Sequence, residues 1–279
     1  MSEIRELSLE EKSFIDPYLP HVEATTSDST TDENHTIRPF VTLTYACSLD
    51  GMISHGPGLR TTLSGPETKS MTHYLRLHHD AILVGVGTLE ADDPSLNCRY
   101  PGLRSDTAIQ PVVLDPRLRG DMQHSKVRAL AKEGSGKPPW ILHAAGVDPA
   151  SAVLEDDCYV MGGHPTASGR LEWSSLLKAL ARKNIRSLMI EGGATVINEL
   201  LLEPELVDSV IVTIAPTWLG QGGVTVSPVS PHSLRGRRSN AARLAGVAWH
   251  QFGEDAVLCG RLSQTIHVGN SLSNKPCRE

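Results

Sequence analysis

The segment that most constrains the fold runs from Ser187 to Leu202, where an apolar run ends at Glu191 and a helical pattern begins after two glycines. This order predicts a buried strand, a tight turn and the first turn of a helix. Gly192 and Gly193 carry no Cβ, so the backbone there can approach a ligand closely. A helix start also offers unpaired N–H groups and the positive end of the helix dipole, which suit a phosphate. The same residues also fit a plain strand-to-helix turn, and both interpretations stay open on this segment alone.

Strand-like and helix-like segments alternate along most of the chain. We expect strands at residues 40–47, 81–86, 111–114, 140–143, 158–161, 187–190 and 207–215, and helices at 66–80, 171–183 and 195–202. Residues 246–252 and 256–262, joined by Gly-Glu-Asp, predict a hairpin. This pattern predicts an α/β fold of three layers, with a mostly parallel sheet and a C-terminal antiparallel hairpin. Glu191 would then lie at the carboxyl end of a strand, where open α/β sheets bind ligands.

One folded domain is expected between residues 37 and 262. Residues 25–35 are almost all small or polar, so we expect residues 1–36 to form a disordered tail and residues 263–279 to be a second, frayed tail. The net charge of −6 argues against a general nucleic-acid binder, and no apolar run is long enough to span a membrane.

Targeting and metal signals are weak in this sequence. The five cysteines are widely spaced without Cys-x-x-Cys, which favours reduced thiols over disulfides or a metal site. The first residues lack the basic start and apolar middle of a signal peptide, so we expect a cytoplasmic location.

A second cluster, residues 85–99, directly follows a predicted buried strand and begins with Gly-Val-Gly. Thr88 and Asp92 are four residues apart, so in a helical turn they would lie on one face and could hold the ribose hydroxyls or amides of a nucleotide. Alternatively, Thr88 caps a helix and Asp92 helps to end it before Pro94.

Several arginines lie close to these clusters in the predicted fold. Arg60, Arg76 and Arg99 are candidates for a substrate phosphate, because the planar guanidinium donates two hydrogen bonds at once, although an isolated arginine can equally lie on a solvated helix face. Arg117 and Arg119 follow another strand and are candidates for the 2′-phosphate of a cofactor. The Asp-Pro pair before them also explains a simple turn.

The common nucleotide and hydrolase motifs are missing. The sequence has no Gly-x-x-x-x-Gly-Lys-Ser/Thr, Gly-x-Ser-x-Gly or His-Glu-x-x-His. A covalent nucleophile is therefore not indicated, whereas hydride transfer needs none because the cofactor supplies that chemistry. Asp50, in an Asp-Gly turn after the first strand, either shapes the turn or faces a ligand.

Four ordered segments, 40–51, 81–94, 189–195 and 214–220, together resemble a known family. They read FVTLTYACSLDG, AILVGVGTLEADDP, MIEGGAT and IAPTWLG. The chain resembles the riboflavin-biosynthesis reductase family, close to the fungal 2,5-diamino-6-ribosylamino-4(3H)-pyrimidinone 5′-phosphate reductases. The resemblance covers nearly all of residues 37–262.

This resemblance implies a dihydrofolate-reductase-like fold, a homodimer and NADPH as hydride donor. The substrate would be a small phosphorylated molecule whose ribosylamine is reduced to a ribitylamino chain. The cofactor contacts implied by the family pattern are Ala46, Thr88, Asp92, Gly193, Ala194, Thr195 and Val196. The implied substrate contacts are Arg76, Leu96, Arg99 and Glu191. The general acid stays open among Asp50, Glu191 and a bound water.

Two other functions remain open at this point. One is a reductase of the same fold that acts on another pterin or pyrimidine, including dihydrofolate. The other is an inert nucleotide-binding protein. Arg76 and Arg99 have a clear task only if the substrate carries a phosphate, which favours reduction of the phosphorylated ribosylamine over both of these functions.

Overall fold

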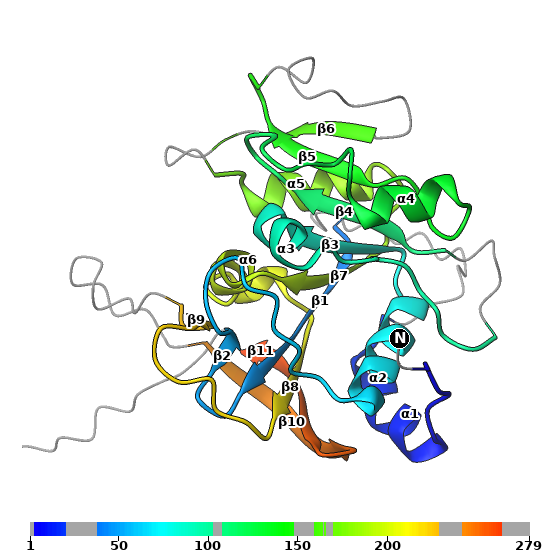
Figure 1. Ribbon diagram of the computed structural model, residues 1–279, viewed down its shortest axis with the longest axis vertical. Helices are drawn as coiled ribbons and strands as arrows, with labels where there is room; N and C mark the ends of the chain where they lie inside the picture. Colours follow the sequence, from blue (N-terminus) through cyan, green and yellow to red (C-terminus); the bar gives the residue numbers. More distant parts are fainter. Residues whose placement is uncertain are drawn as a thin grey trace, which may run out of the picture.

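A computed structural model describes residues 3–20, 38–102, 108–147, 159–163, 165, 170–228 and 242–263 (Figure 1). The helices are α1 (Leu9–Ile15), α2 (Pro66–Leu77), α3 (Val86–Asp92), α4 (Lys126–Lys132), α5 (Trp173–Ala181) and α6 (Ala194–Leu200). Short 3-10 turns follow at Asp16–Tyr18 and Pro204–Leu206.

The strands of the described residues form one large sheet of nine strands in the order β10-β11-β8-β1-β7-β3-β4-β5-β6. Their bounds are β1 (Phe40–Ser48), β3 (Ala81–Gly85), β4 (Gln110–Leu114), β5 (Trp140–Ala144), β6 (Tyr159–Gly163), β7 (Ser187–Gly192), β8 (Ser209–Ala215), β10 (Arg243–Phe252) and β11 (Asp255–Ser263). Neighbouring strands from β8 to β6 run parallel, and β10 and β11 add an antiparallel hairpin beside β8. The predicted α/β fold, mostly parallel with a C-terminal hairpin, is confirmed.

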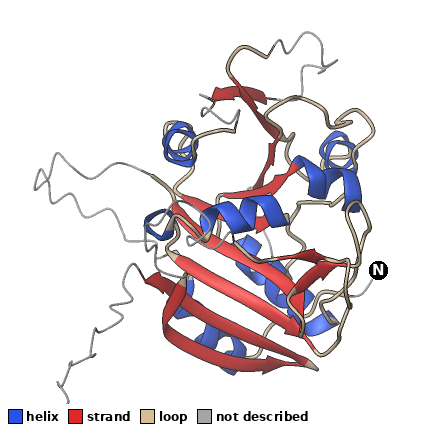
Figure 2. Cartoon of the chain, turned by 90° about the vertical axis from the view of Figure 1, so that its left-hand side faces the viewer, coloured by secondary structure: helices blue, strands red, loops and turns tan. Residues whose placement is uncertain are grey.

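Helices cover both faces of the sheet, so the predicted three layers are present (Figure 2). Alternation along β3 shows why: Ile82 and Val84 join the apolar cluster of α2 and α4, while Ala81 and Leu83 join that of α5 and α6. A strand buried on both faces reads as a continuous apolar run, as β3 does.

A separate two-stranded ribbon pairs β2 (Met52–Ser54) with β9 (Val224–Thr225). The strand β2 begins four residues after β1 ends, so the ribbon lies at the edge where the parallel strands finish. This placement matters because the candidate site lies at the same edge.

The prediction of a disordered tail is wrong for residues 3–20, which fold back onto the domain as helix α1 and a 3-10 turn. Ser8 and Glu11 form a capping box, with Ser8 Oγ accepting from Glu11 N and the Glu11 carboxylate accepting from Ser8 N. Leu7 and Ile15 are buried. The polar composition of residues 25–35 suggested a tail, and the prediction extended it too far towards the N-terminus.

Residues 21–37 and 264–279 lie outside the described residues, so the remainder of the two predicted tails stays a prediction. The domain boundaries at 37 and 262 likewise remain predictions. Among the described residues, no helix has the length and apolar character needed to cross a membrane.

Candidate active site

A cavity of about 470 Å³ lies at the carboxyl ends of β3, β4 and β7. Its wall is formed by the starts of α3 and α6, the segment after β4, and the β2–β9 ribbon with the loop that follows β2. The lining residues include Ile53, Ser54, Gly56–Leu59, Thr61, Gly85–Thr88, Ala91, Asp92, Leu114, Pro116, Arg119, Arg170, Leu171, Gly193–Val196, Glu199 and Val224. A cavity of this size, at this edge of a parallel sheet, is typical of a small-molecule site.

Two glycine turns meet at the centre of this wall. A Cβ added to Gly193 would lie 2.8 Å from Thr88 Oγ1, closer than real Cβ contacts allow. A Cβ on Gly85 would lie 3.3 Å from Val196 Cγ2. Gly192 adopts a φ of 111°, a backbone conformation that favours glycine. The glycines therefore let the starts of α3 and α6 touch and leave backbone exposed to the cavity.

Six of the seven residues implied as cofactor contacts line this one cavity: Thr88, Asp92, Gly193, Ala194, Thr195 and Val196. They come from two motifs about a hundred residues apart in the chain, and β3 and β7 bring them together because these strands are parallel neighbours. Ala46 is not among the lining residues; it lies near the end of β1, half-buried, opposite Thr213 of β8.

Asp92 is the lining residue with a clearly shifted acidity. Burial raises the pKa of its carboxyl group, and the positive charge of Arg60 acts in the opposite direction. A half-buried carboxylate in a cavity is poorly hydrated, so hydrogen bonds from hydroxyl or amide groups of a ligand would stabilise its charged form.

Charged side chains stand at the rim of the cavity. Arg119 is 58% exposed and lies 3.5 Å from Glu90. Arg170 forms an ion pair with Glu199, and both line the cavity. Of the two arginines proposed for a 2′-phosphate, Arg119 reaches the cavity wall, whereas Arg117 is not among the residues lining it.

Sequence reasoning missed Arg170, Glu199 and the loop at residues 56–59. Glu199 follows Thr195 by four residues and so lies on the same face of α6, a signal that was present in the sequence. The Gly-Pro-Gly at 56–58 marks a turn but does not say what the turn covers. Contact between this loop and the glycine turns depends on the tertiary fold.

The implied substrate residues form a second group that does not line the cavity. The guanidinium of Arg76, on α2, donates hydrogen bonds to both carboxylate oxygens of Glu191, on β7, in a fork-like geometry. Nε lies 3.0 Å from Oε1, and Nη2 lies 2.9 Å from both oxygens. Arg76 Nη1 also donates to the carbonyl of Asn97, at 2.8 Å. The side chains of Arg76 and Glu191 are 11% and 19% exposed, so the two residues form a largely buried, bidentate ion pair.

Arg99 is held by α2 as well. Its backbone N–H donates to Nδ1 of His73 at 3.0 Å, and its guanidinium Nη2 lies 3.2 Å from the other ring nitrogen. Burial, together with the charges of Arg76 and Arg99, lowers the pKa of His73 to about 3, so the ring is neutral and its Nδ1 can accept. The Arg99 residue itself is exposed, unlike His73.

Leu96 has no exposed surface, and its side chain belongs to the apolar cluster beneath α2. Its φ of 47° shows that the backbone turns sharply there. With no exposed surface, neither the side chain nor the backbone of Leu96 is accessible to a ligand in this structure.

Asp50 serves as an anchor for the loop before Gly220. Its carboxylate accepts from the Ser48 hydroxyl and from the amides of Leu219 and Gly220, at 3.2 Å and 2.8 Å. The Ser48 hydrogen bond is the main reason that the pKa of Asp50 is lowered. A carboxylate held in its charged form is a poor proton donor, which argues against Asp50 as the general acid.

Among the described residues, no cluster of three or more His, Cys, Asp or Glu side chains is arranged to hold a metal ion. The polar groups gathered here are instead a glycine-walled cavity, one half-buried carboxylate and rim arginines, with a carboxylate–arginine fork beside them. This combination of groups is suited to an organic anion.

The chain belongs to the RibD C-terminal domain family, whose model matches residues 39–258, and so to the pyrimidine reductases of riboflavin biosynthesis. It is 40% identical over 257 residues to the 2,5-diamino-6-ribosylamino-4(3H)-pyrimidinone 5′-phosphate reductase of Candida glabrata, covering 89% of this chain and 95% of that protein. The protein of the same name from Saccharomyces cerevisiae is 40% identical over 251 residues, covering 90% of this chain and 94% of the relative.

A solved structure gives the same result. The S. cerevisiae riboflavin biosynthesis reductase Rib7 superimposes with a TM-score of 0.72 at 36% sequence identity, covering 90% of this chain and 99% of that one. The RibD protein of Acinetobacter baumannii, at 24% identity and a TM-score of 0.62, shares the fold.

Proposed function

We propose that this protein reduces 2,5-diamino-6-ribosylamino-4(3H)-pyrimidinone 5′-phosphate to its ribitylamino product in riboflavin biosynthesis, with NADPH as the hydride donor. One observation carries the proposal. Two distant glycine motifs converge on one cavity beside the Arg76–Glu191 pair, in a chain 40% identical to reductases of that name over about nine-tenths of its length.

The cavity fits a nicotinamide dinucleotide. The absence of Cβ atoms at Gly192 and Gly193 lets a pyrophosphate approach the backbone at the start of α6. Thr88 and Asp92 face the same space and suit ribose or amide groups. When bound, NADPH supplies the hydride for the reduction.

Arg119 favours NADPH over NADH. Its exposed guanidinium stands at the cavity rim after β4, next in the sheet to β3, so it can meet a phosphate on the outer ribose. Arginine pairs with such a 2′-phosphate in many dinucleotide sites, whereas NADH has only hydroxyls there.

The second group of residues suits the phosphorylated substrate. We assign Arg99 to the 5′-phosphate, because its guanidinium is on an exposed residue whose backbone is fixed by His73. We assign Glu191 to the polar groups of the pyrimidine or of the opened sugar, with Arg76 fixing its orientation. The chain then accelerates the reaction chiefly by holding the reacting groups in register and excluding water. A bound water delivers the proton that reduction of the imine requires, because both oxygens of the Glu191 carboxylate accept hydrogen bonds from the charged Arg76.

The decisive experiment combines the purified protein, NADPH and the ribosylamine substrate, and follows the loss of reduced-cofactor absorbance. We expect oxidation of NADPH and formation of the ribitylamino product. Dihydrofolate in place of the substrate separates this function from that of a reductase for another pterin. Tight binding of NADPH without turnover of either compound would favour an inert nucleotide-binding protein. A homodimer and a cytoplasmic location belong to the same proposal.

A further inference from the structure

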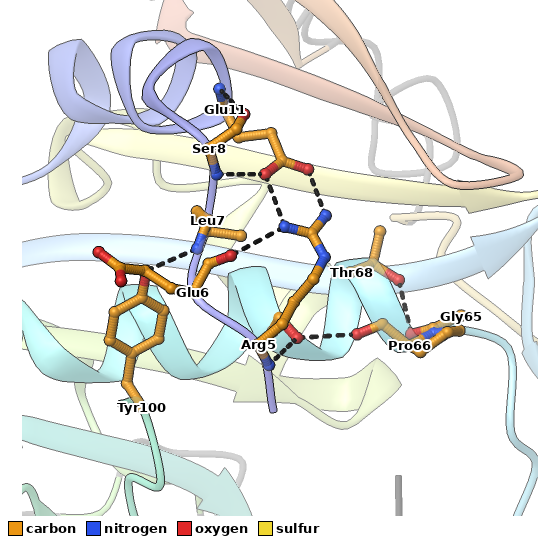
Figure 3. Close-up of polar contacts among 10 residues, drawn as sticks. Arg5, Glu6, Leu7, Ser8, Glu11, Gly65, Pro66, Thr68 and Tyr100 are labelled. Atoms are coloured by element: carbon orange, nitrogen blue, oxygen red, sulfur yellow. Dashed lines mark hydrogen bonds and ion pairs between the residues drawn. The ribbon is translucent and has the colours of Figure 1, made fainter. Parts of the chain in front are cut away.

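Residues 3–20, here called the N-terminal strap, lie outside the family match of 39–258 yet pack against the substrate half of the site (Figure 3). The strap runs beside α2 and carries α1 (Figure 1). Its buried side chains Leu7 and Ile15 share one apolar cluster with Leu75 of α2 and with Leu96. The strap therefore adds buried apolar side chains to a core that is otherwise formed mainly by residues of the family match.

Two hydrogen bonds join the strap to α2. The backbone N–H of Arg5 donates to Ser70 Oγ at 3.1 Å, close to the start of the helix. The hydroxyl of Tyr74 donates to Asp16 Oδ1 at 2.7 Å, one turn further along α2. The two bonds fix one side of α2 along the two turns that precede Arg76.

Another hydrogen bond joins the strap to the segment 96–100. The backbone N–H of Leu7 donates to the Tyr100 hydroxyl at 2.8 Å, and this contact is buried (Figure 3). The rings of Tyr74 and Tyr100 pack together in a tilted arrangement, with 5.2 Å between centroids and 54° between planes, so the anchor points on α2 and on the segment also contact each other. The strap thus holds both pieces at once.

These two pieces carry the arginines assigned to the substrate. Arg76 of α2 donates to the carbonyl of Asn97, and His73 of α2 accepts from the amide of Arg99. Any slip of the segment 96–100 along α2 would break both contacts and move Arg99 relative to Glu191.

The strap is stiff enough to resist such a slip. The Arg5 guanidinium bonds both carboxylate oxygens of Glu11, at 2.9 Å and 2.5 Å, while that carboxylate also accepts from Ser8 N in the capping box. These bonds close the start of the strap into a ring of polar contacts.

We propose that the N-terminal strap is a positioning element for the substrate: through Tyr100 and Tyr74 it locks the segment 96–100 against α2 and so sets the distance between Arg99 and Glu191. This inference rests on the proposed function. The cofactor cavity lacks strap residues in its lining, so the strap should act on substrate affinity and leave NADPH affinity alone.

The strap also offers a matched control. At its far end the Tyr18 hydroxyl donates to the carbonyl of Gly246 at 2.7 Å, on β10 of the hairpin. Tyr18→Phe and Tyr100→Phe each remove one hydroxyl that ties the strap to the domain, but only Tyr100 touches the substrate half. A strap that merely stabilises the fold would give the two variants the same kinetics.

The test measures KM for the substrate, Kd for NADPH and Tm for full-length wild type, Tyr100→Phe and Tyr18→Phe. We expect Tyr100→Phe to raise KM about 3- to 10-fold, as loss of one buried hydrogen bond would. We expect its NADPH Kd to stay within about twofold of wild type, and Tyr18→Phe to keep both constants while losing a similar part of Tm. Ser70→Ala, which removes the acceptor for Arg5, is the second variant if Tyr100→Phe does not fold, and should also raise KM.

The outcomes distinguish the positioning role of the strap from the proposed function of the protein. Equal KM values for all folded variants, with wild-type turnover intact, would overturn the positioning role alone. A parallel rise of KM and NADPH Kd in Tyr100→Phe would overturn it too, because the whole site would then be disturbed. No turnover by the wild type would overturn the proposed function first.

Discussion

The two halves of the candidate site are built by different means. The cofactor half is made of backbone: glycine turns after β3 and β7 meet where a Cβ would not fit, and neighbouring residues of the same motifs complete the wall. The substrate half is made of side chains from distant elements. Arg76 and Glu191 are 115 residues apart in the chain, and Arg99 is fixed by a histidine 26 residues before it.

This difference predicts how each half fails. A backbone wall tolerates changes around it but not an added atom, because close packing leaves no room for one. A side-chain network fails when one partner is removed, because the other is left with an unpaired buried charge or donor. Substitutions should therefore separate the halves cleanly, each weakening one ligand.

The largest effect is expected from Gly193→Ala. Its Cβ would lie 2.8 Å from Thr88 Oγ1, so the Thr88 side chain, or the turn that carries it, must shift. Overpacking costs about 1–3 kcal/mol, which would weaken NADPH binding by roughly 5- to 150-fold. Fluorescence titration with NADPH checks this.

Gly136→Ala is the matched control for that change. Its nearest neighbours to a new Cβ are 3.8 Å and 3.9 Å away, an ordinary contact distance, so NADPH affinity should stay at the wild-type value. Unchanged NADPH affinity in Gly193→Ala would show that NADPH does not bind against this wall.

The next effect concerns Arg76→Lys. Lysine keeps the charge but cannot form the fork to Glu191 or reach the Asn97 carbonyl at the same time. We expect kcat/KM to fall about 30-fold, equivalent to about 2 kcal/mol, with NADPH Kd within about twofold of wild type.

Arg38→Lys is its control, since Arg38 forms a similar fork to Asp208, with Nη1–Oδ2 at 2.6 Å and Nη2–Oδ1 at 2.9 Å. That pair lies at the opposite end of β1 from Ala46 and from Asp50, so the variant should lose stability while keeping kcat/KM. If both variants lose activity equally, the Arg76 fork supports the fold and not the substrate.

The same contrast explains what the sequence could reveal. The fold was predictable because strand runs such as 81–86 and the closing hairpin carry local patterns of their own. The glycine wall was predictable because Gly193 and its neighbours are contiguous in sequence. When the role of a residue depends on one contiguous motif, that motif is enough to predict the role.

The remaining features depend on tertiary pairing. No local sequence pattern indicates that Arg76 pairs with Glu191, or that the loop at 56–59 lines the cavity. The prediction of a tail rests on the polar composition of residues 25–35, whereas Leu7 and Ile15 become core residues through packing with elements distant in sequence, α2 among them. Sequence alone does not display such long-range complements.

A smaller effect is expected from Arg99→Ala, which removes the proposed phosphate ligand. The KM for the substrate should rise about 10-fold, because a charge-assisted hydrogen bond is worth roughly 1.5 kcal/mol or more, and NADPH affinity should hardly change. Steady-state kinetics at saturating NADPH, paired with a direct NADPH titration, measures both. Loss of NADPH binding with an unchanged KM would show that the two ligands have been assigned to the wrong halves.

Arg119→Gln tests the rim of the cofactor half. Glutamine keeps hydrogen-bonding groups but loses the charge that faces a 2′-phosphate, so kcat/KM should fall about fivefold with NADPH and stay constant with NADH. The ratio of the two values isolates the phosphate contribution from any general disturbance. Glu90→Gln, which removes the partner of Arg119, should raise that ratio slightly or leave it unchanged. An equal loss with both cofactors would place the 2′-phosphate elsewhere.

The smallest effect on either ligand, and the sharpest test of how α2 is attached, comes from His79. This buried ring bonds the Leu75 carbonyl through Nδ1, at 2.7 Å, and Thr42 Oγ1 of β1 through Nε2, at 2.8 Å. Burial lowers its pKa to about 4, compared with about 6.5 in an unfolded chain. Between these values the unfolded state binds the extra proton, so stability falls as the pH falls through this window.

We expect the free energy of unfolding to drop by about 1–2 kcal/mol for His79 between pH 6.5 and pH 5, measured by urea denaturation. His73, whose pKa is also lowered by burial, should add a similar slope. His79→Gln should remove its share of that slope, whereas substitution of the exposed His124 should not. His73 lies on α2 and His79 just after its end, and both rings stay neutral in the folded protein above about pH 5, so the KM for the substrate and the Kd for NADPH should not follow this loss of stability. A KM that rises in step with the loss of stability would mean that one of these rings already takes up a proton in the folded protein, and would contradict the lowered pKa.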